Sequence, residues 1–384
     1  MMLAAASFAA QAMVRATDSL LPQIAADLHV TVGATSVIVT FYLLAHGSVQ
    51  LVIGPIGDRF GKYLCTALAA AAASAMVALC GLAPSLSFLV AARLGSGLAT
   101  GWIIPFAFAF IGDVIPYVRR QQVLGRFLSG QILGQLFGQA AGGVLGDQFG
   151  WRNMFFILAG LLAAATLGLF YELWRNPITR ASHPTAQPGQ GFVADYSLVL
   201  RSPWARAVCA MVFVESAALF GAFTFVGADL HLRFGVDFTV VGLFVGCFAI
   251  GGLVYSLSVS QLLMRLGQPG LAAAGGVILA LAFTTLAFAP HYWIAPVAIV
   301  TVGLGFYMLH NTLQTNATQM TPEARGTAVA IFSSALYIGQ TAGVALGGAV
   351  FDRFTAVPVF LGAAAVLLML GAWFSRALAR RKAA

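Results

Sequence analysis

The chain has 384 residues, of which 60% are hydrophobic and only 8% are charged. A soluble domain carries about 25% charged residues, so this composition excludes a soluble globular protein. The net charge of +8 does not indicate nucleic-acid binding, because the basic residues lie between apolar runs rather than on one soluble segment. Apolar runs of about 20 residues, enough to cross a bilayer, recur along the chain and predict a membrane protein.

In chain order, the apolar runs predict twelve membrane-spanning helices in two groups of six. The first six spans are expected at 2–23, 33–55, 63–82, 86–112, 123–146 and 153–172. The other six are expected at 206–229, 237–262, 269–289, 293–318, 326–350 and 356–375. The predicted fold is therefore an all-α membrane protein with an N-terminal half (1–172), a proline-containing polar linker (173–205) and a C-terminal half (206–384).

The distribution of Lys and Arg predicts the orientation of the chain. Fifteen of the 20 basic residues fall on the side that carries both termini and the linker, and three fall in the opposite loops. Because short cytoplasmic loops are enriched in Lys and Arg, both termini are expected in the cytoplasm, with the protein in a bacterial inner membrane.

The two groups of spans repeat one another. A shift of 205 residues carries the fifth span onto the eleventh, and Asp147 onto Asp352. The glycines that coincide are Gly134, Gly138, Gly142 and Gly143 in the first half and Gly339, Gly343, Gly347 and Gly348 in the second. Glycines at this spacing predict close helix packing. Repeated halves of this kind usually enclose a site near the middle of the membrane.

The connection after the second span carries a specific motif. It comprises Gly54, Gly57, Asp58, Arg59, Gly61 and Lys62. This loop resembles the signature G-x-L-a-D-r-x-G-r-k of the major facilitator superfamily. The resemblance implies a major facilitator fold, secondary transport driven by protons, and a conformational gate in which Asp58 latches the loop to the second half.

Three further spans resemble motifs of the same superfamily. Arg93 and Gly97 in the fourth span match R-x-x-q-G. The segment from Asp18 to Leu28 resembles the D-x-x-L-P-x-I-a-x-D-L signature of twelve-span drug:proton antiporters of the bicyclomycin-resistance and arabinose-efflux type. In the fifth span, Gln139 replaces the proline of that family's G-x-x-x-G-P-x-x-G-G motif, so antiport and symport both stay open.

Four charged residues are predicted within the membrane, where charges are costly and usually functional. Arg15 precedes Asp18 by one helical turn and is expected to pair with it, which favours the ionised carboxylate. Arg93 is expected in the same layer as Asp18; the alternative is a structural arginine bonded to backbone carbonyls. Glu215 has no basic neighbour on its own helix. We therefore expect Glu215 to be the main proton carrier, with Asp18 and Arg93 as coupling partners; the alternative is a neutral hydrogen-bonding acid.

Weaker signals concern the substrate path. Asn311 and Gln314 share one helix face and, with Arg15, are the candidate substrate-binding residues; they can equally bond neighbouring helices. His46 and His231 are expected to be structural. Neither a metal cluster nor a cofactor-binding or catalytic motif is present in the sequence, so no cofactor is expected.

The sequence thus predicts a monomeric transporter in the lipid bilayer that exports a small organic solute or drug in exchange for protons. The alternative within this class is a symporter or exporter of sugars, siderophores or other metabolites. A membrane-embedded enzyme or sensor is disfavoured, because the longest soluble stretch is the linker at 173–205. The substrate itself is not specified by these patterns.

Overall fold

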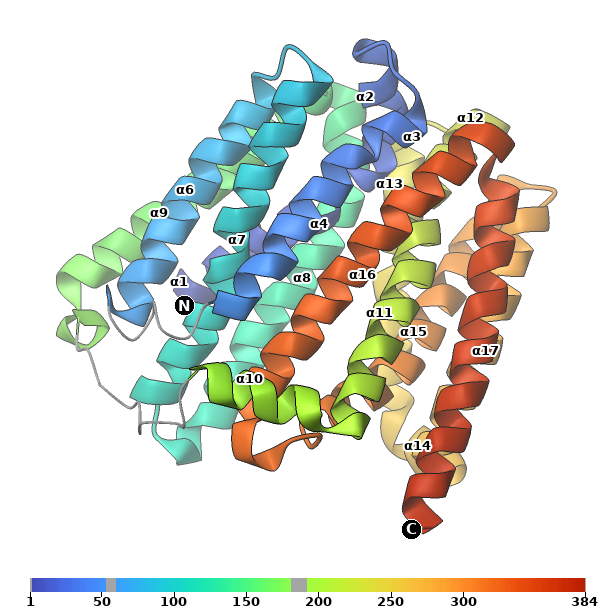
Figure 1. Ribbon diagram of the computed structural model, residues 1–384. Coiled ribbons are helices and arrows are strands. Elements are labelled where there is room, and N and C mark those ends of the chain that lie inside the picture. Colours follow the sequence, from blue (N-terminus) through green and yellow to red (C-terminus); the bar gives the residue numbers. More distant parts are fainter. Residues whose placement is uncertain (1, 53–59, 181–191, 384) are drawn as a thin grey trace.

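The computed structural model describes residues 2–52, 60–180 and 192–383, and the regular elements among them are all helices (Figure 1). The first half forms α1 (Met2–Arg15), α2 (Leu21–Asp27), α3 (Val32–Thr35), α4 (Val37–Val49), α6 (Lys62–Gly81), α7 (Leu86–Val114), α8 (Tyr117–Phe149) and α9 (Trp151–Arg175). The second half forms α11 (Pro203–Phe223), α12 (Val226–Phe234), α13 (Phe238–Gly246), α14 (Phe248–Phe288), α15 (Ala295–Ala317), α16 (Arg325–Phe354) and α17 (Ala356–Ala383).

These helices make the twelve predicted crossings. Nine segments of the described chain are long and apolar enough to cross a bilayer, and one of them, Phe238–Phe288, holds two crossings. That segment breaks at Gly267, whose φ of 62° and ψ of 178° leave the helical region, and Pro269 follows. The two remaining crossings are α1 with α2, which is interrupted, and α8, whose glutamines and glycines lower its hydropathy. The described residues thus account for the twelve crossings that the sequence predicts.

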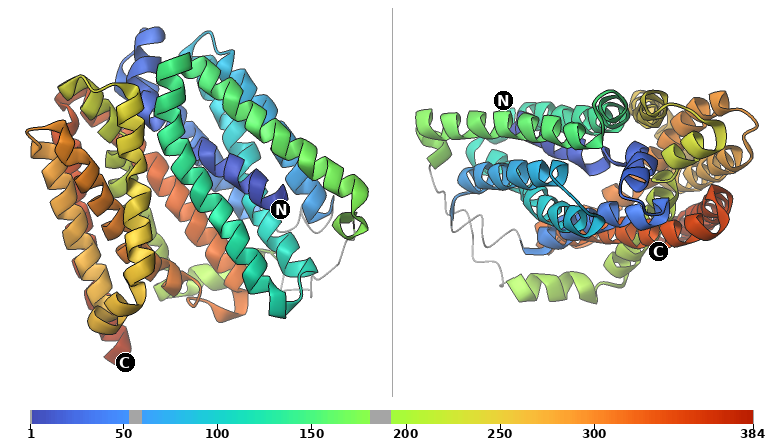
Figure 2. Two further views of the ribbon diagram at one scale, coloured as in Figure 1. Left: turned by 180° about the vertical axis from the view of Figure 1, so that it is seen from behind. Right: turned by 90° about the horizontal axis from the view of Figure 1, so that it is seen from above.

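The two halves lie side by side, as Figures 1 and 2 show. One large cluster of buried apolar side chains is built almost entirely from residues 6–169, and another from residues 199–378. Because each half crosses the membrane an even number of times, the linker and both termini lie at one end of the bundle. We call this end the terminal end and the opposite one the distal end.

The linker contains a helix that the sequence analysis did not predict. Helix α10 (Phe192–Arg201) lies across the direction of the spanning helices at the terminal end (Figure 1). The hydroxyl of its Tyr196 donates to the carbonyl of Leu51 in the first half, at 2.7 Å. The sequence did not predict α10, because its ten residues are too few to stand out from the polar, proline-containing linker around them.

The repeated glycines bring one pair of helices in each half into backbone contact. A Cβ atom built on Gly138 of α8 would lie 2.1 Å from the carbonyl oxygen of Ala12 in α1. A Cβ atom on the equivalent Gly343 of α16 would lie 2.0 Å from the carbonyl oxygen of Ala217 in α11. Both positions exclude any side chain, so the same packing places α1, which leads directly to Asp18, and α11, which carries Glu215, against their partners.

Candidate functional site

The first spanning helix is interrupted where its charged residues lie. Helix α1 ends at Arg15, a 3-10 turn covers Asp18–Leu20, and α2 resumes at Leu21. Pro22 has no amide hydrogen to donate to the carbonyl four residues earlier, which is that of Asp18. The end of α1 also favours a cation at Arg15, because the last carbonyls of a helix carry partial negative charge.

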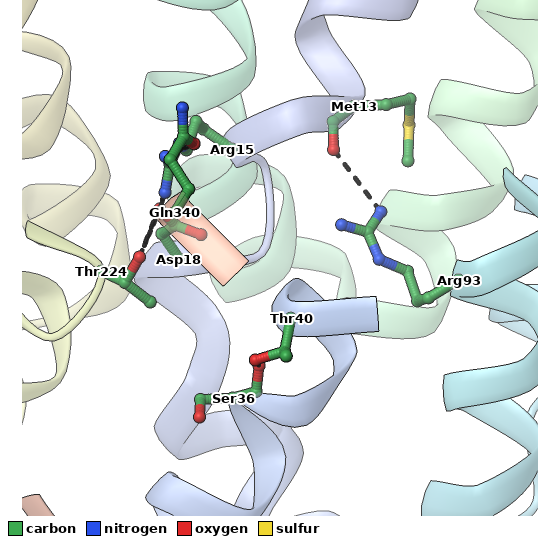
Figure 3. Close-up of polar contacts among 8 residues, drawn as sticks. All are labelled: Met13, Arg15, Asp18, Ser36, Thr40, Arg93, Thr224 and Gln340. Atoms are coloured by element: carbon green, nitrogen blue, oxygen red, sulfur yellow. Dashed lines mark hydrogen bonds and ion pairs between the residues drawn. The ribbon is translucent and has the colours of Figure 1, made fainter. Parts of the chain in front are cut away.

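Arg15 joins the two halves in the interior of the protein (Figure 3). Its guanidinium donates to Asp18 Oδ2 at 3.1 Å, to Thr224 Oγ1 at 3.1 Å, and to Gln340 Oε1. It also lies 4.2 Å from the centre of the Phe220 ring. Arg15 and Asp18 come from the first half, whereas Thr224, Gln340 and Phe220 come from the second. The predicted Arg15–Asp18 pair is therefore present, and it is part of a larger cross-half network.

This network is closed to solvent. Arg15 and Asp18 are each 2% exposed, Gln340 is 3% exposed and Thr224 is fully buried. Among the described residues, Asp18 Oδ1 has no hydrogen-bond partner. A change in the charge of Asp18 therefore acts on Arg15 and, at 3.5 Å from Asp18 Oδ2, on the Thr224 hydroxyl of the second half.

Arg93 lies apart from this network (Figure 3). Its side chain is fully buried, with the guanidinium 4.1 Å above the Tyr42 ring. Its nitrogens lie 3.4 Å from the carbonyl oxygens of Met13 and Ile38, and within the described chain it makes no ion pair with Asp18. This arrangement matches the alternative in which Arg93 binds backbone carbonyls and supports α1 from within the first half.

Glu215 lies in α11, and it has a partner that the sequence analysis did not predict. Its carboxylate Oε2 is 2.8 Å from Nδ1 of His310 in α15. Glu215 has no basic neighbour on its own helix, as predicted, but a residue 95 positions further along the chain supplies an imidazole partner. Glu215 is fully buried, and its second oxygen has no partner among the described residues.

The remaining candidates are spread over the structure. Asn311 is half-buried and bonds to the Tyr255 side chain, and Gln314 is exposed, so neither joins the Arg15 network. Gly54, Gly57, Asp58 and Arg59 lie outside the described residues. Of the same loop, Gly61 has a φ of 87° and Lys62 forms an ion pair with Asp113 of α7. Nδ1 of His46 lies 3.2 Å from the Thr100 hydroxyl oxygen, and Nδ1 of His231 lies 2.9 Å from the Val236 carbonyl oxygen.

The model of the Major Facilitator Superfamily matches residues 3–327 and 233–384 of the chain. The chain belongs to the Major Facilitator Superfamily. An uncharacterized MFS-type transporter of Bacillus subtilis, YceJ, is 24% identical over 355 residues, which cover 91% of this chain and 88% of that protein. A Helicobacter pylori protein named "Probable sugar efflux transporter" is 23% identical over 285 residues, covering 73% and 70%.

Solved structures share the fold of this superfamily member. The crystal structure of the nucleoside transporter NupG superposes with a TM-score of 0.76 at 15% identity, covering 98% of both chains. A bacterial homolog of the human lysosomal transporter Spinster superposes with a TM-score of 0.75 at 16% identity, covering 97% and 94%. Membership of the Major Facilitator Superfamily, rather than this likeness of fold, identifies the protein as a transporter and not an enzyme.

The two halves of this transporter also contact each other at the distal end. The contacts are made by two aspartates that occupy equivalent positions in the two halves. Asp147, near the end of α8, accepts hydrogen bonds from the amide of Thr239 at 3.2 Å and from its hydroxyl at 2.6 Å. Asp352, near the end of α16, accepts from the amide of Gly33 at 2.7 Å and from the hydroxyl of Thr31. Each carboxylate lies where a helical segment of the other half begins, and free amides there favour negative charge.

The backbones of the two halves touch at the same level. A Cβ atom on Gly143 would lie 2.6 Å from Cα of Gly242, and one on Gly348 would lie 3.0 Å from the carbonyl oxygen of Gly33. The distal end is therefore closed by backbone contact, with one aspartate contact on each side.

Removing both charges is expected to open the distal end. In Asp147→Asn/Asp352→Asn the amide oxygens still accept hydrogen bonds, but the attraction to the helix starts is lost. At about 1 kcal/mol for each site, the population of distally open molecules should rise roughly 30-fold.

Spin labels at the exposed positions Phe149 and Leu232, one in each half, would report the change by pulsed dipolar spectroscopy. The control is Asp237→Asn, which removes an exposed distal aspartate that forms no cap hydrogen bond with its helix. An unchanged distance distribution in the double variant would show that these carboxylates do not hold the distal end closed.

Proposed function

We propose that this transporter couples proton movement to the export of a small organic solute across a bacterial inner membrane. The two halves would rock about the Arg15 network, so that the site faces each side in turn. One observation supports the proposal above all. The buried carboxylate of Asp18 pairs with Arg15, and Arg15 donates hydrogen bonds to Thr224 and Gln340 of the other half. Protonation of Asp18 would weaken its ion pair with Arg15. It would therefore alter the contacts between the halves that must break when the halves rock.

The proposed proton path uses both membrane carboxylates. Glu215 is the main carrier, and Asp18 passes the change in charge to the interface between the halves. Neutralising Asp18 would leave Arg15 without its counter-charge, so Arg15 would become available to an anionic or polar group of the solute. Arg93 supports α1 at the carbonyl of Met13, and Asn311 and Gln314 complete the proposed substrate path from α15.

The terminal end is proposed to face the cytoplasm, as the excess of Lys and Arg indicates. Reporter fusions at Pro184 and after Ala384 should then both give a cytoplasmic signal. A periplasmic signal at either site would reverse the orientation.

Everted membrane vesicles with an imposed proton gradient test the coupling. A pH-sensitive dye would be used to find, from a panel of drugs and sugars, a solute that collapses the gradient in a transporter-dependent way. Glu215→Gln and Asp18→Asn should each abolish that collapse, because neither amide can carry a proton. If Glu215→Gln keeps gradient-driven transport while Asp18→Asn abolishes it, the main carrier is in the first span. If both variants keep it, the transport is not proton-coupled through these groups.

A second candidate, export or symport of a sugar-like solute, is favoured by Gln139. This residue of α8 is 1% exposed, and among the described residues neither atom of its amide has a hydrogen-bond partner. A buried free amide can pair with the hydroxyl groups of a sugar, and a relative named for sugar efflux points the same way. The same panel separates the candidates, because sugars rather than drugs would then collapse the gradient.

A further inference from the structure

The surroundings of Glu215 differ strongly between its two sides. Towards the distal end, the next turns of α11 place the buried rings of Phe220 and Phe223, and Phe248 of α14 lies 5.0 Å from the Phe223 ring centre. These rings offer no polar group through which a proton could pass. The Arg15 network lies beyond these rings, with its guanidinium 4.2 Å from the Phe220 ring centre, so a proton moving along α11 from Thr224 to Glu215 would have to pass them.

Towards the terminal end, α15 supplies polar groups of increasing accessibility. His310 is 8% exposed and contacts Glu215 Oε2, whereas Glu215 is fully buried. Asn311 is half-buried, and Gln314, one turn further towards the terminal end, is exposed. The imidazole therefore stands between the buried carboxylate and the accessible part of α15.

The position of His310 is held by ring packing. The Phe306 ring stacks on the imidazole with centroids 4.7 Å apart, and the Phe332 ring of α16 lies 5.8 Å away. Within the described chain, His310 is the one residue that forms a side-chain hydrogen bond with Glu215. An imidazole can accept a proton at one nitrogen and release one from the other, which suits it to relay protons.

We propose that His310 is the proton relay through which Glu215 exchanges its proton with the terminal end of the bundle, and that its Nδ1 positions the carboxylate. In this step the proton leaves the Glu215 carboxyl for the imidazole, and the imidazolium then releases a proton to water near Gln314. No other bond is formed or broken. This inference rests on the proposed function, which gives Glu215 the transported proton.

Time-resolved infrared spectroscopy on the protein in liposomes tests the relay without a solute. The probe is the carbonyl stretching band of a protonated buried carboxyl, assigned to Glu215 by its loss in Glu215→Gln. After a jump to alkaline pH, the band should decay at the wild-type rate in a control, His231→Asn, whose histidine lies outside the proposed path. In His310→Asn the amide can still donate to Oε2 but cannot carry a proton, so the decay should slow roughly 100-fold.

Decay of the band at the wild-type rate in His310→Asn would overturn the relay. A second measurement, on the wild-type protein in oriented liposomes, does not depend on a variant that folds. An alkaline jump confined to the terminal side should discharge Glu215, whereas faster discharge from the distal side would also overturn the proposal. Absence of any band lost in Glu215→Gln would instead count against Glu215 as the proton carrier, and hence against the proposed function.

Discussion

Gly138→Ala is expected to lower the stability of the folded protein by about 3 kcal/mol, although it adds a single methyl group. The new Cβ would lie 2.1 Å from the carbonyl oxygen of Ala12 and 2.7 Å from its Cα. These are backbone atoms, so no side chain can turn away and α1 and α8 must separate. The shift would also move Arg15, one turn further along α1. The melting temperature of the detergent-solubilised protein, followed by size-exclusion of a fluorescent fusion, should fall clearly.

Gly160→Ala is the matched control for this prediction. Gly160 is also a helical glycine, in α9, but a Cβ built on it meets no heavy atom within 4 Å. Alanine has the higher helix propensity, so Gly160→Ala should be neutral or stabilising by up to about 1 kcal/mol. Gly343→Ala should repeat the loss in the second half, where the contact to Ala217 is equally close. Equal melting temperatures for Gly138→Ala and Gly160→Ala would refute the packing argument.

Arg15→Leu is expected to abolish transport and to destabilise the protein by about 3–5 kcal/mol, because it leaves the Asp18 carboxylate buried without a counter-charge. Gln340 would also lose its bond to the first half, and Thr224 would keep only its 3.5 Å contact with Asp18. Arg15→Lys should keep much of the stability, because the positive charge beside Asp18 remains. It should transport more slowly, because an ammonium group cannot donate to all three partners at once as the planar guanidinium does. Transport is measured in vesicles with an imposed proton gradient, and stability by the melting temperature.

The double variant Arg15→Leu/Asp18→Asn separates stability from function. It removes both charges together, so most of the lost stability should return while transport stays absent. Recovery of transport in the double variant would show that the pair only holds the fold. A single variant as stable as the wild type would mean that Asp18 is already neutral beside Arg15.

The spanning helices and the repeat could be predicted from the sequence, because a bilayer enforces local patterns. A crossing must satisfy its own backbone hydrogen bonds and is usually apolar over about 20 residues, so hydropathy locates most of the crossings, although α8 and the interrupted first crossing are less apolar. The predicted spans at 237–262 and 269–289 are separated at the right place, because Gly267 and Pro269 disfavour a continuous helix there. The Arg15–Asp18 pair could be predicted because both groups lie within one turn of the same span.

The partners across helices were decided only by the tertiary structure. The contact of His310 with Glu215 depends on how α15 and α11 are rotated and tilted against each other. The same holds for the bond from Arg15 to Gln340, and for Arg93, which faces the carbonyls of Met13 and Ile38. The faces of a membrane helix differ little in hydropathy. The rotation of the helix about its own axis is therefore set by packing against its neighbours and not by its own sequence.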